Sequence, residues 1–186
     1  MAFFLVAVLF SLYATFTLSS FSEEELSGRF DLLAVTPLSR ARLLLERSAF
    51  VGVSIVAGAL LVGVATELGM VIGGGALAFG TVEAAALATV APALCMVGLT
   101  TFFCGVTPRW ARTLAPAVIV WSFVVEVAAG ISTSEQSLVR LSLFHWMSAL
   151  PAGEFQVGGT LGLLAVGLLG SLLGVVEFGR RDLRTA

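Results

Sequence analysis

Residues 84–108 read AAALATVAPALCMVGLTTFFCGVTP, a run of twenty-five residues without a charged side chain. A helix needs about 20 mostly apolar residues to cross a bilayer, so this run predicts a transmembrane helix. The whole chain has the same character: of its 186 residues, 58% are hydrophobic and 12% are charged, and the mean hydropathy is +1.04. Because soluble domains carry about 25% charged residues, this composition excludes a soluble globular enzyme and a disordered chain.

Four more apolar runs flank this stretch. We predict an all-α, polytopic transmembrane helical bundle forming one domain, with five spans at about residues 2–21, 48–70, 84–107, 113–131 and 156–177. Gly73-Gly74-Gly75 marks a turn after the second span, and we expect Glu67 and Glu83 beside it to be solvated. Pro92 predicts a kink in the third span. Residues 132–155 are expected to form an outer loop that can include a re-entrant helix.

The arginines orient these spans. The chain has ten basic residues, all of them Arg, and nine fall on one side of the membrane if five spans alternate. Arg140 is the exception. Since cytoplasmic loops carry an excess of Arg and Lys, we expect the N-terminus outside and the C-terminus in the cytoplasm. The chain would then begin outside the membrane with no charged residue before its first span. We therefore expect that a span upstream of it is lacking.

The connection after the first span has local chemistry of its own. Ser22 followed by Glu25 forms a capping box, which predicts the start of a short amphipathic cytoplasmic helix over residues 23–35. Pro37 ends this helix, and Ser39 can cap the next one, which carries Arg40 and Arg42 into the second span. The residues alone leave two interpretations open: a helix resting on lipid, or a docking helix for a cytoplasmic partner.

Three stretches resemble one family of transporters. Residues 23–45, EEELSGRFDLLAVTPLSRARLLL, are similar to the coupling-helix region of type-2 ATP-binding-cassette (ABC) exporter permeases. Residues 143–146 (LFHW) with 149–155 (ALPAGEF) resemble the outer loop before the last span of long antibiotic-exporter permeases of high-GC bacteria, and residues 179–183 (GRRDL) resemble their ending. The chain resembles the C-terminal part of one permease half and lacks that family's first span.

This resemblance implies a function and a set of partners. It implies a multi-pass permease of the bacterial plasma membrane that exports an antibiotic, drug-like or lipid-like substrate. ATP and Mg²⁺ would be bound by a separate cytoplasmic ABC ATPase, with no cofactor on this chain, and a second permease half or a second copy would complete the bundle in the lipid bilayer. The residues placed where the family contacts its ATPase are Glu24, Glu25, Gly28, Arg29, Asp31, Thr36 and Pro37.

A few residues are candidates for a substrate path. Glu126 is a charge inside a span, and such charges are costly enough that they usually face a cavity or a partner. It can line a path with Trp121, or it can snorkel to the outer surface or remain a neutral, hydrogen-bonded acid. Phe144, His145 and Trp146 in the outer loop are candidates for an outer gate or for an interfacial helix, since aromatic residues favour the membrane interface.

Other chemistries find little support. Glu24, Glu25 and Arg29 match the Glu-Glu-x-x-x-Arg motif of membrane-embedded metalloproteases, but the chain has a single His, at position 145, and no Asn for the companion motif. With no Lys, it lacks the residue that a phosphate loop needs. Cys95 and Cys104 lie too far apart along one helix for a disulfide. We therefore expect no enzyme, no metal site and no nucleic-acid binding. The alternative to a permease is a non-transporting multi-pass membrane anchor or assembly protein.

Overall fold

The structure is a computed structural model that describes residues 2–26, 40–74, 79–131, 140, 142–147 and 156–181. Within these ranges the chain is helical apart from short turns, and no β-strand occurs. Five helical stretches are long and apolar enough to cross a membrane, so the predicted all-α class with five spans is confirmed. The elements are α1 (Ala2–Leu26), α2 (Arg40–Ile72), α3 (Phe79–Ala88), α4 (Val90–Val106), α5 (Pro108–Ile131), the 3₁₀ helix η2 (Phe144–Trp146) and α7 (Val157–Arg181).

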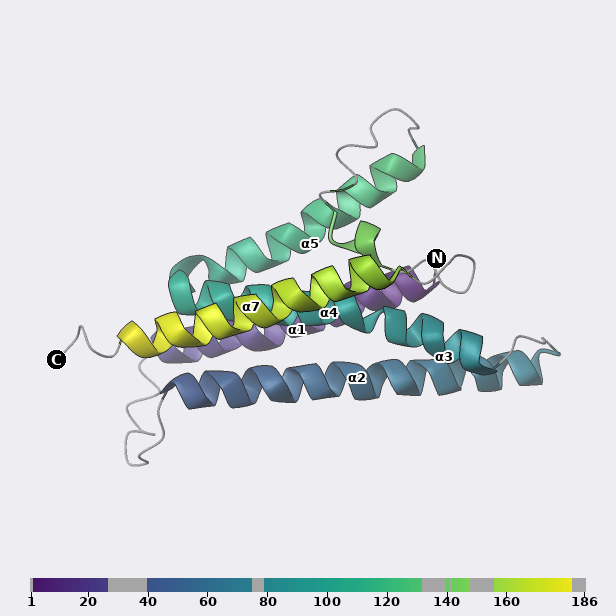
Figure 1. The fold of residues 1–186 in the computed structure, drawn as a ribbon, viewed down its shortest axis with the longest axis horizontal. Helices are drawn as coiled ribbons and strands as arrows, with labels where there is room; N and C mark the ends of the chain where they lie inside the picture. Colours follow the sequence, from purple (N-terminus) through teal and green to yellow (C-terminus); the bar gives the residue numbers. More distant parts are fainter. Residues whose placement is uncertain are drawn as a thin grey trace.

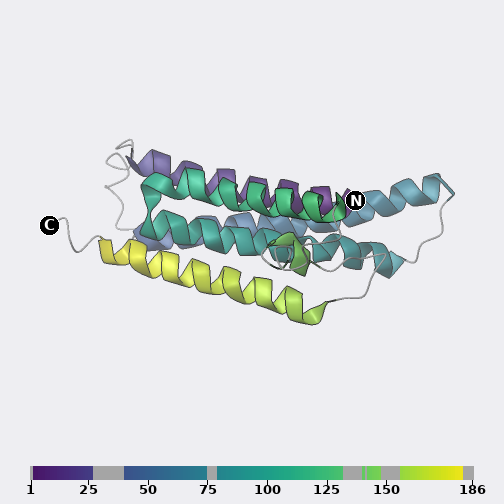
Figure 2. The ribbon, with the colours of Figure 1, turned by 90° about the horizontal axis from the view of Figure 1, so that it is seen from above.

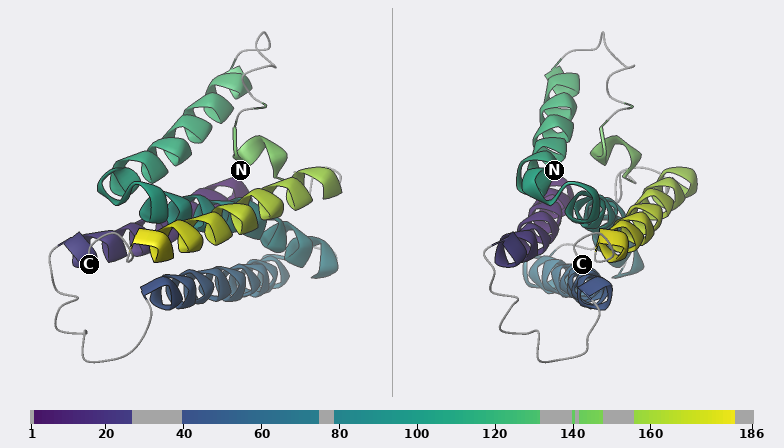
Figure 3. Two further views of the ribbon diagram at one scale, coloured as in Figure 1. Left: turned by 60° about the vertical axis from the view of Figure 1, so that its left-hand side comes forward. Right: turned by 90° about the vertical axis from the view of Figure 1, so that its left-hand side faces the viewer.

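Helix α4 is the centre of the bundle. In the most apolar part of the span that α3 and α4 form together, 72% of the residues are buried, against 22% to 33% in the other four spans. Helices α1, α2, α5 and α7 all pack against α4 and surround it in the end-on view of Figure 3. A helix that is apolar on every side is thus shielded by its neighbours, while the surrounding helices turn apolar faces outward, as a lipid environment favours.

The third span bends where Pro92 predicts a kink. The helix is interrupted at Thr89, between α3 and α4. A proline ring clashes with the carbonyl group four residues earlier and offers it no N–H, so the disruption falls one turn before Pro92. Thr89 closes the break with its own groups: its backbone N–H and its hydroxyl both donate to the carbonyl oxygen of Ala86, at 3.1 and 2.6 Å.

Helix α2 is the longest element. It begins at Arg40, directly after Ser39, and its 33 residues extend about 50 Å, well beyond the ~30 Å hydrocarbon core of a bilayer. It ends in the predicted glycine turn, where Gly74 has φ +74. The far end of α2 projects past the other helices together with α3 (Figures 1 and 2).

The two carboxylates of this projecting hairpin differ from expectation. We predicted that Glu67 and Glu83 are solvated. Of each residue, one carboxylate oxygen is buried and has no hydrogen-bond partner among the described residues. Glu83 lies over Gly63 of α2 so closely that a β-carbon there would meet its carboxylate. The prediction holds only in part, since both side chains are half-buried where α2 and α3 pack against each other instead of separating at the turn.

Two predicted helix starts are also wrong. We expected Ser22 to cap a new helix, but α1 continues without a break to Leu26, since neither Gly nor Pro interrupts residues 22–26. The rest of the predicted helix, through residue 35, lies outside the described residues. We expected the fourth span to begin at about residue 113, yet α5 already begins at Pro108, because proline is favoured in the first position of a helix.

Candidate functional site

A cavity of about 700 Å³ opens between α4, α5, α7 and η2. Its volume lies within the range typical of small-molecule sites. Most of its wall is apolar, and each of the three long helices contributes a stripe of side chains at helical spacing. The wall residues are Cys95, Leu99 and Phe103 of α4, Leu114, Ala117, Val118, Trp121 and Ser122 of α5, Gly158, Gly159, Gly162, Leu163 and Val166 of α7, and Arg140, Ser142, Leu143 and Trp146 around η2.

The cavity exists because α5 and α7 are held by different partners. Phe4 of α1 stacks on Phe123 of α5, with ring centroids 5.8 Å apart, and meets Phe144 edge-on at 5.3 Å. This contact holds α5 against α1. Helix α7 instead packs along α4. Figure 3 shows α5 diverging from α7. Residues of both helices line the cavity.

Hydroxyl groups fix η2 at one end of the cavity. The Ser142 hydroxyl donates to the carbonyl oxygen of Ser122 at 3.2 Å, and the backbone N–H of Leu143 donates to the Ser122 hydroxyl at 3.1 Å. The indole N–H of Trp146 donates to the carbonyl oxygen of Arg140 at 2.9 Å. A β-carbon on Gly159 would lie 2.6 Å from the carbonyl oxygen of Trp146, so the first turn of α7 rests directly on η2.

The structure separates the aromatic candidates. Trp121 and Trp146 line the cavity and are 53% and 42% exposed, so the cavity is not sealed. Phe144 is instead a core residue, 3% exposed. His145 is exposed and stands edge-on to the Trp146 ring at 5.7 Å. The outer-gate role of these residues stays a prediction.

Glu126 lies away from the cavity. It follows Phe123 by three residues and Ile119 by seven, so it shares the face of α5 that packs against α1. It is not one of the cavity residues. One of its carboxylate oxygens is buried and has no hydrogen-bond partner in the described part of the chain. Its role in a substrate path remains untested.

The predicted ATPase contacts are placed only in part. Glu24 and Glu25 belong to the last turn of α1, while Gly28, Arg29, Asp31, Thr36 and Pro37 lie outside the described residues. The described residues hold no group of three or more His, Cys, Asp or Glu that could bind a metal ion.

Sequence reasoning missed the hydroxyl groups that join the helices. The Oγ of Ser48 on α2 and the Oγ1 of Thr101 on α4 are 2.9 Å apart, and both residues are buried. The Oγ1 atoms of Thr15 and Thr100 join α1 to α4 at 3.5 Å, and the Cys104 thiol donates to the Leu18 carbonyl oxygen at 3.7 Å. Such side chains occur in any membrane helix, so only the packing identifies which of them meet.

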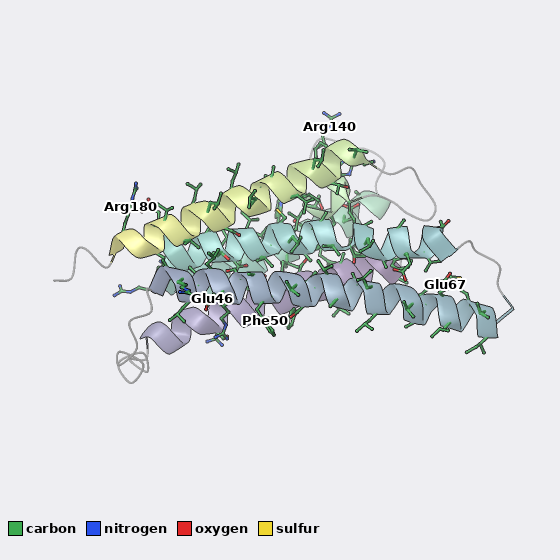
Figure 4. All side chains as sticks on the ribbon, turned by 60° about the horizontal axis from the view of Figure 1, so that its bottom comes forward. Glu46, Phe50, Glu67, Arg140 and Arg180 are labelled. Atoms are coloured by element: carbon green, nitrogen blue, oxygen red, sulfur yellow. The ribbon has the colours of Figure 1, made fainter. Side chains whose placement is uncertain are left out.

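Charges gather at the two ends of the bundle. Leu44, Cys104, Ala111 and Phe178 form one buried cluster, which places the start of α2 and the end of α7 together. Ion pairs sit at this end, Arg42 with Glu46 at 2.7 Å and Arg180 with Glu177 at 3.1 Å. Figure 4 shows Arg180 and Glu46 toward this end, and Arg140 and Glu67 toward the other.

An apolar helical bundle with charged ends, five membrane-length helices and an open apolar cavity defines the class of multi-pass membrane proteins. Residues 1–179 match the family model of the multidrug efflux system permease Rv1217c, C-terminal domain. The chain therefore belongs to this family and is a permease domain of a multidrug efflux system. No curated protein matches it.

Proposed function

We propose that this chain is the membrane-spanning permease part of an ATP-driven ABC exporter in a bacterial plasma membrane. The observation that carries the proposal is the apolar cavity between α4, α5 and α7, since an exporter of hydrophobic molecules needs a binding site inside its bundle. Energy would come from a separate cytoplasmic ABC ATPase that binds ATP and Mg²⁺. A second permease half or a second copy of the chain would complete the transport path.

The contacts of α1 suggest how a push could reach the cavity. Residues 23–37 comprise the last turn of α1 and most of its connection to α2, and we propose that they contact the ATPase. Helix α1 touches α4 through Thr15 and Thr100 and touches α5 through Phe4 and Phe123. A displacement of α1 would therefore move α5 relative to α4 and α7, and so change the width of the cavity. Such a rearrangement of packed helices is the usual form of a two-state switch.

The test measures ATP hydrolysis and dye export together. The chain is purified from its own host membranes with any ATPase that accompanies it, and the complex is reconstituted in vesicles with the hydrophobic dye Hoechst 33342. We expect the dye to stimulate ATP hydrolysis and to be exported. Gly162→Trp should abolish both effects, because the space beside Gly162 is open and the new side chain would fill the cavity.

The matched control is Leu161→Trp. Leu161 is 60% exposed on the outer side of α7, so a tryptophan there should leave export unchanged. If no ATPase accompanies the chain, and Gly162→Trp leaves dye movement unchanged, the chain is a membrane anchor or assembly protein instead.

A further inference from the structure

We propose that the cavity binds an amphiphile with an acidic headgroup, whose headgroup pairs with Arg140 while its apolar chain lies between α4, α5 and α7. This inference rests on the proposed function, because it names the substrate class for the same cavity. It can still be tested on the permease alone, without an ATPase, so its failure would be separate from failure of the exporter proposal.

The charge pattern of the wall favours an acid. Arg140 is the one charged residue among the described residues of the wall, and no Asp or Glu is among them. Its side chain is exposed and makes no hydrogen bond or ion pair with any described residue. The backbone of Arg140 is held in place by the indole of Trp146. A guanidinium group pairs well with a carboxylate or phosphate, which it can contact through two N–H groups.

The two serine hydroxyl groups of the wall are already engaged. Ser142 donates to a backbone carbonyl oxygen and accepts from the N–H of Phe144 at 3.2 Å. Ser122 accepts from the N–H of Leu143. The part of the wall formed by α4, α5 and α7 therefore offers few partners for a drug with many polar groups. It suits an unbranched apolar chain.

The depth of the cavity fits a chain that enters from one leaflet. On α4 the wall extends from Cys95 to Phe103, and on α7 from Gly158 to Val166, which is about 12 Å along each helix. This is less than half of the ~30 Å hydrocarbon core. Arg140 and Trp146 lie at the end where α7 begins, and the wall then continues inward along the three helices. The ligand would hold its head at the membrane surface and its chain within one leaflet.

The experiment measures quenching of tryptophan fluorescence in lipid nanodiscs. A variant that keeps only Trp146 (Trp110→Phe with Trp121→Phe) is titrated with 5-doxylstearic acid, and separately with its uncharged methyl ester, at alkaline pH so that the acid is ionised. A second variant keeps only Trp110, which is 63% exposed and does not line the cavity. It reports quenching that comes from partition into the bilayer alone.

We expect the acid to quench Trp146 with saturation and with an affinity about threefold to fivefold higher than that of the ester, as for an exposed ion pair. Trp110 should show no such difference. Arg140→Gln should remove the preference for the acid and Arg140→Lys should keep most of it. The matched control Arg109→Gln changes an exposed Arg of α5 that does not line the cavity and should leave the preference intact.

Equal quenching of Trp146 by acid and ester would overturn the proposal in favour of a site for neutral apolar molecules. Quenching of Trp146 no stronger than that of Trp110 would overturn it differently, by indicating that another membrane helix covers the cavity. A preference for the acid that persists in Arg140→Gln would also reject the role given to Arg140.

Discussion

Gly98 of α4 and Gly167 of α7 meet backbone against backbone: a β-carbon on Gly98 would overlap the carbonyl group of Gly167. The same close approach recurs along the line of contact between α4 and α7, which we call the seam. A β-carbon on Gly167 would lie 2.7 Å from the carbonyl oxygen of Leu94, and one on Gly170 would lie 2.9 Å from the carbonyl oxygen of Gly98. Membrane helices associate by such close packing because lipid provides no hydrophobic force between them. This seam holds α7 in place on one side of the cavity.

Gly98→Ala should destabilise the protein, because α4 and α7 would have to separate. Overpacking of this kind costs about 1–3 kcal/mol. The measurement is the temperature at which the detergent-solubilised protein loses its monodisperse peak in size-exclusion chromatography. Gly162→Ala is the matched control, as nothing lies within 4 Å of its added β-carbon, and it should be neutral or slightly stabilising. An equal loss in both variants would contradict the close seam.

Removal of the hydroxyl pair between α2 and α4 should destabilise the bundle modestly. We expect a coupling energy of about 0.6 kcal/mol, and at most about 1.7 kcal/mol, between Ser48→Ala and Thr101→Val in a double-mutant cycle, the range found for hydrogen bonds between membrane helices. The measurement is unfolding in a graded mixture of SDS and mild detergent. The control is Ser54→Ala, because the Ser54 hydroxyl donates to the Phe50 carbonyl oxygen of its own helix. This variant should show no coupling to Thr101→Val.

Glu126→Gln should raise thermal stability, because a buried carboxylate oxygen without a partner favours the uncharged side chain. Since Glu126 faces α1 and does not line the cavity, the same variant should leave quenching of Trp146 by 5-doxylstearic acid unchanged. Dye export by the reconstituted complex supplies a second readout. A shift in which dyes are exported, with normal stability, would instead assign Glu126 to a substrate path elsewhere in the assembly.

The orientation of the bundle follows from the arginines. In a background of Cys95→Ala and Cys104→Ala, a cysteine introduced at Ser39 should react with a membrane-impermeant maleimide only from the cytoplasmic side, and one at Ser134 only from outside. The physical reason is the retention of Arg-rich segments in the cytoplasm. Reaction of both positions from the same side would rule out five alternating spans.

The sequence predicts the class of fold well and the cavity poorly, for identifiable reasons. Charge-free runs mark spans because lipid excludes charge, and Pro92 marks a kink because it lacks an N–H. The cavity depends instead on which side of α5 meets α1, which is decided by the contact of Phe4 with Phe123. No local pattern records that contact. Likewise, Gly170 and Gly174 pack on α4, while Gly158 and Gly162, which have the same spacing in the sequence, face open space.

The connection between α1 and α2 provides the most direct test of energy coupling. Glu24 and Glu25, just before it, belong to the last turn of α1, so a force on them would pass straight into a span. Replacing both with Ala should reduce dye-stimulated ATP hydrolysis and export while the helices stay folded. We expect a larger loss in the double variant than in either single one, because charges at the rim of an interface each contribute modestly.

Gly28→Pro should have a stronger effect, since proline inside a helix costs about 3 kcal/mol and removes a backbone donor. Thermal stability of the isolated permease serves as the control for folding in both variants. If the double Ala variant and the Gly28→Pro variant each assemble normally and export dye at the wild-type rate, the segment does not contact the ATPase. In that case the acidic residues would sit at the membrane surface, where carboxylates remain hydrated, and the force on α1 would have to come from elsewhere in the complex.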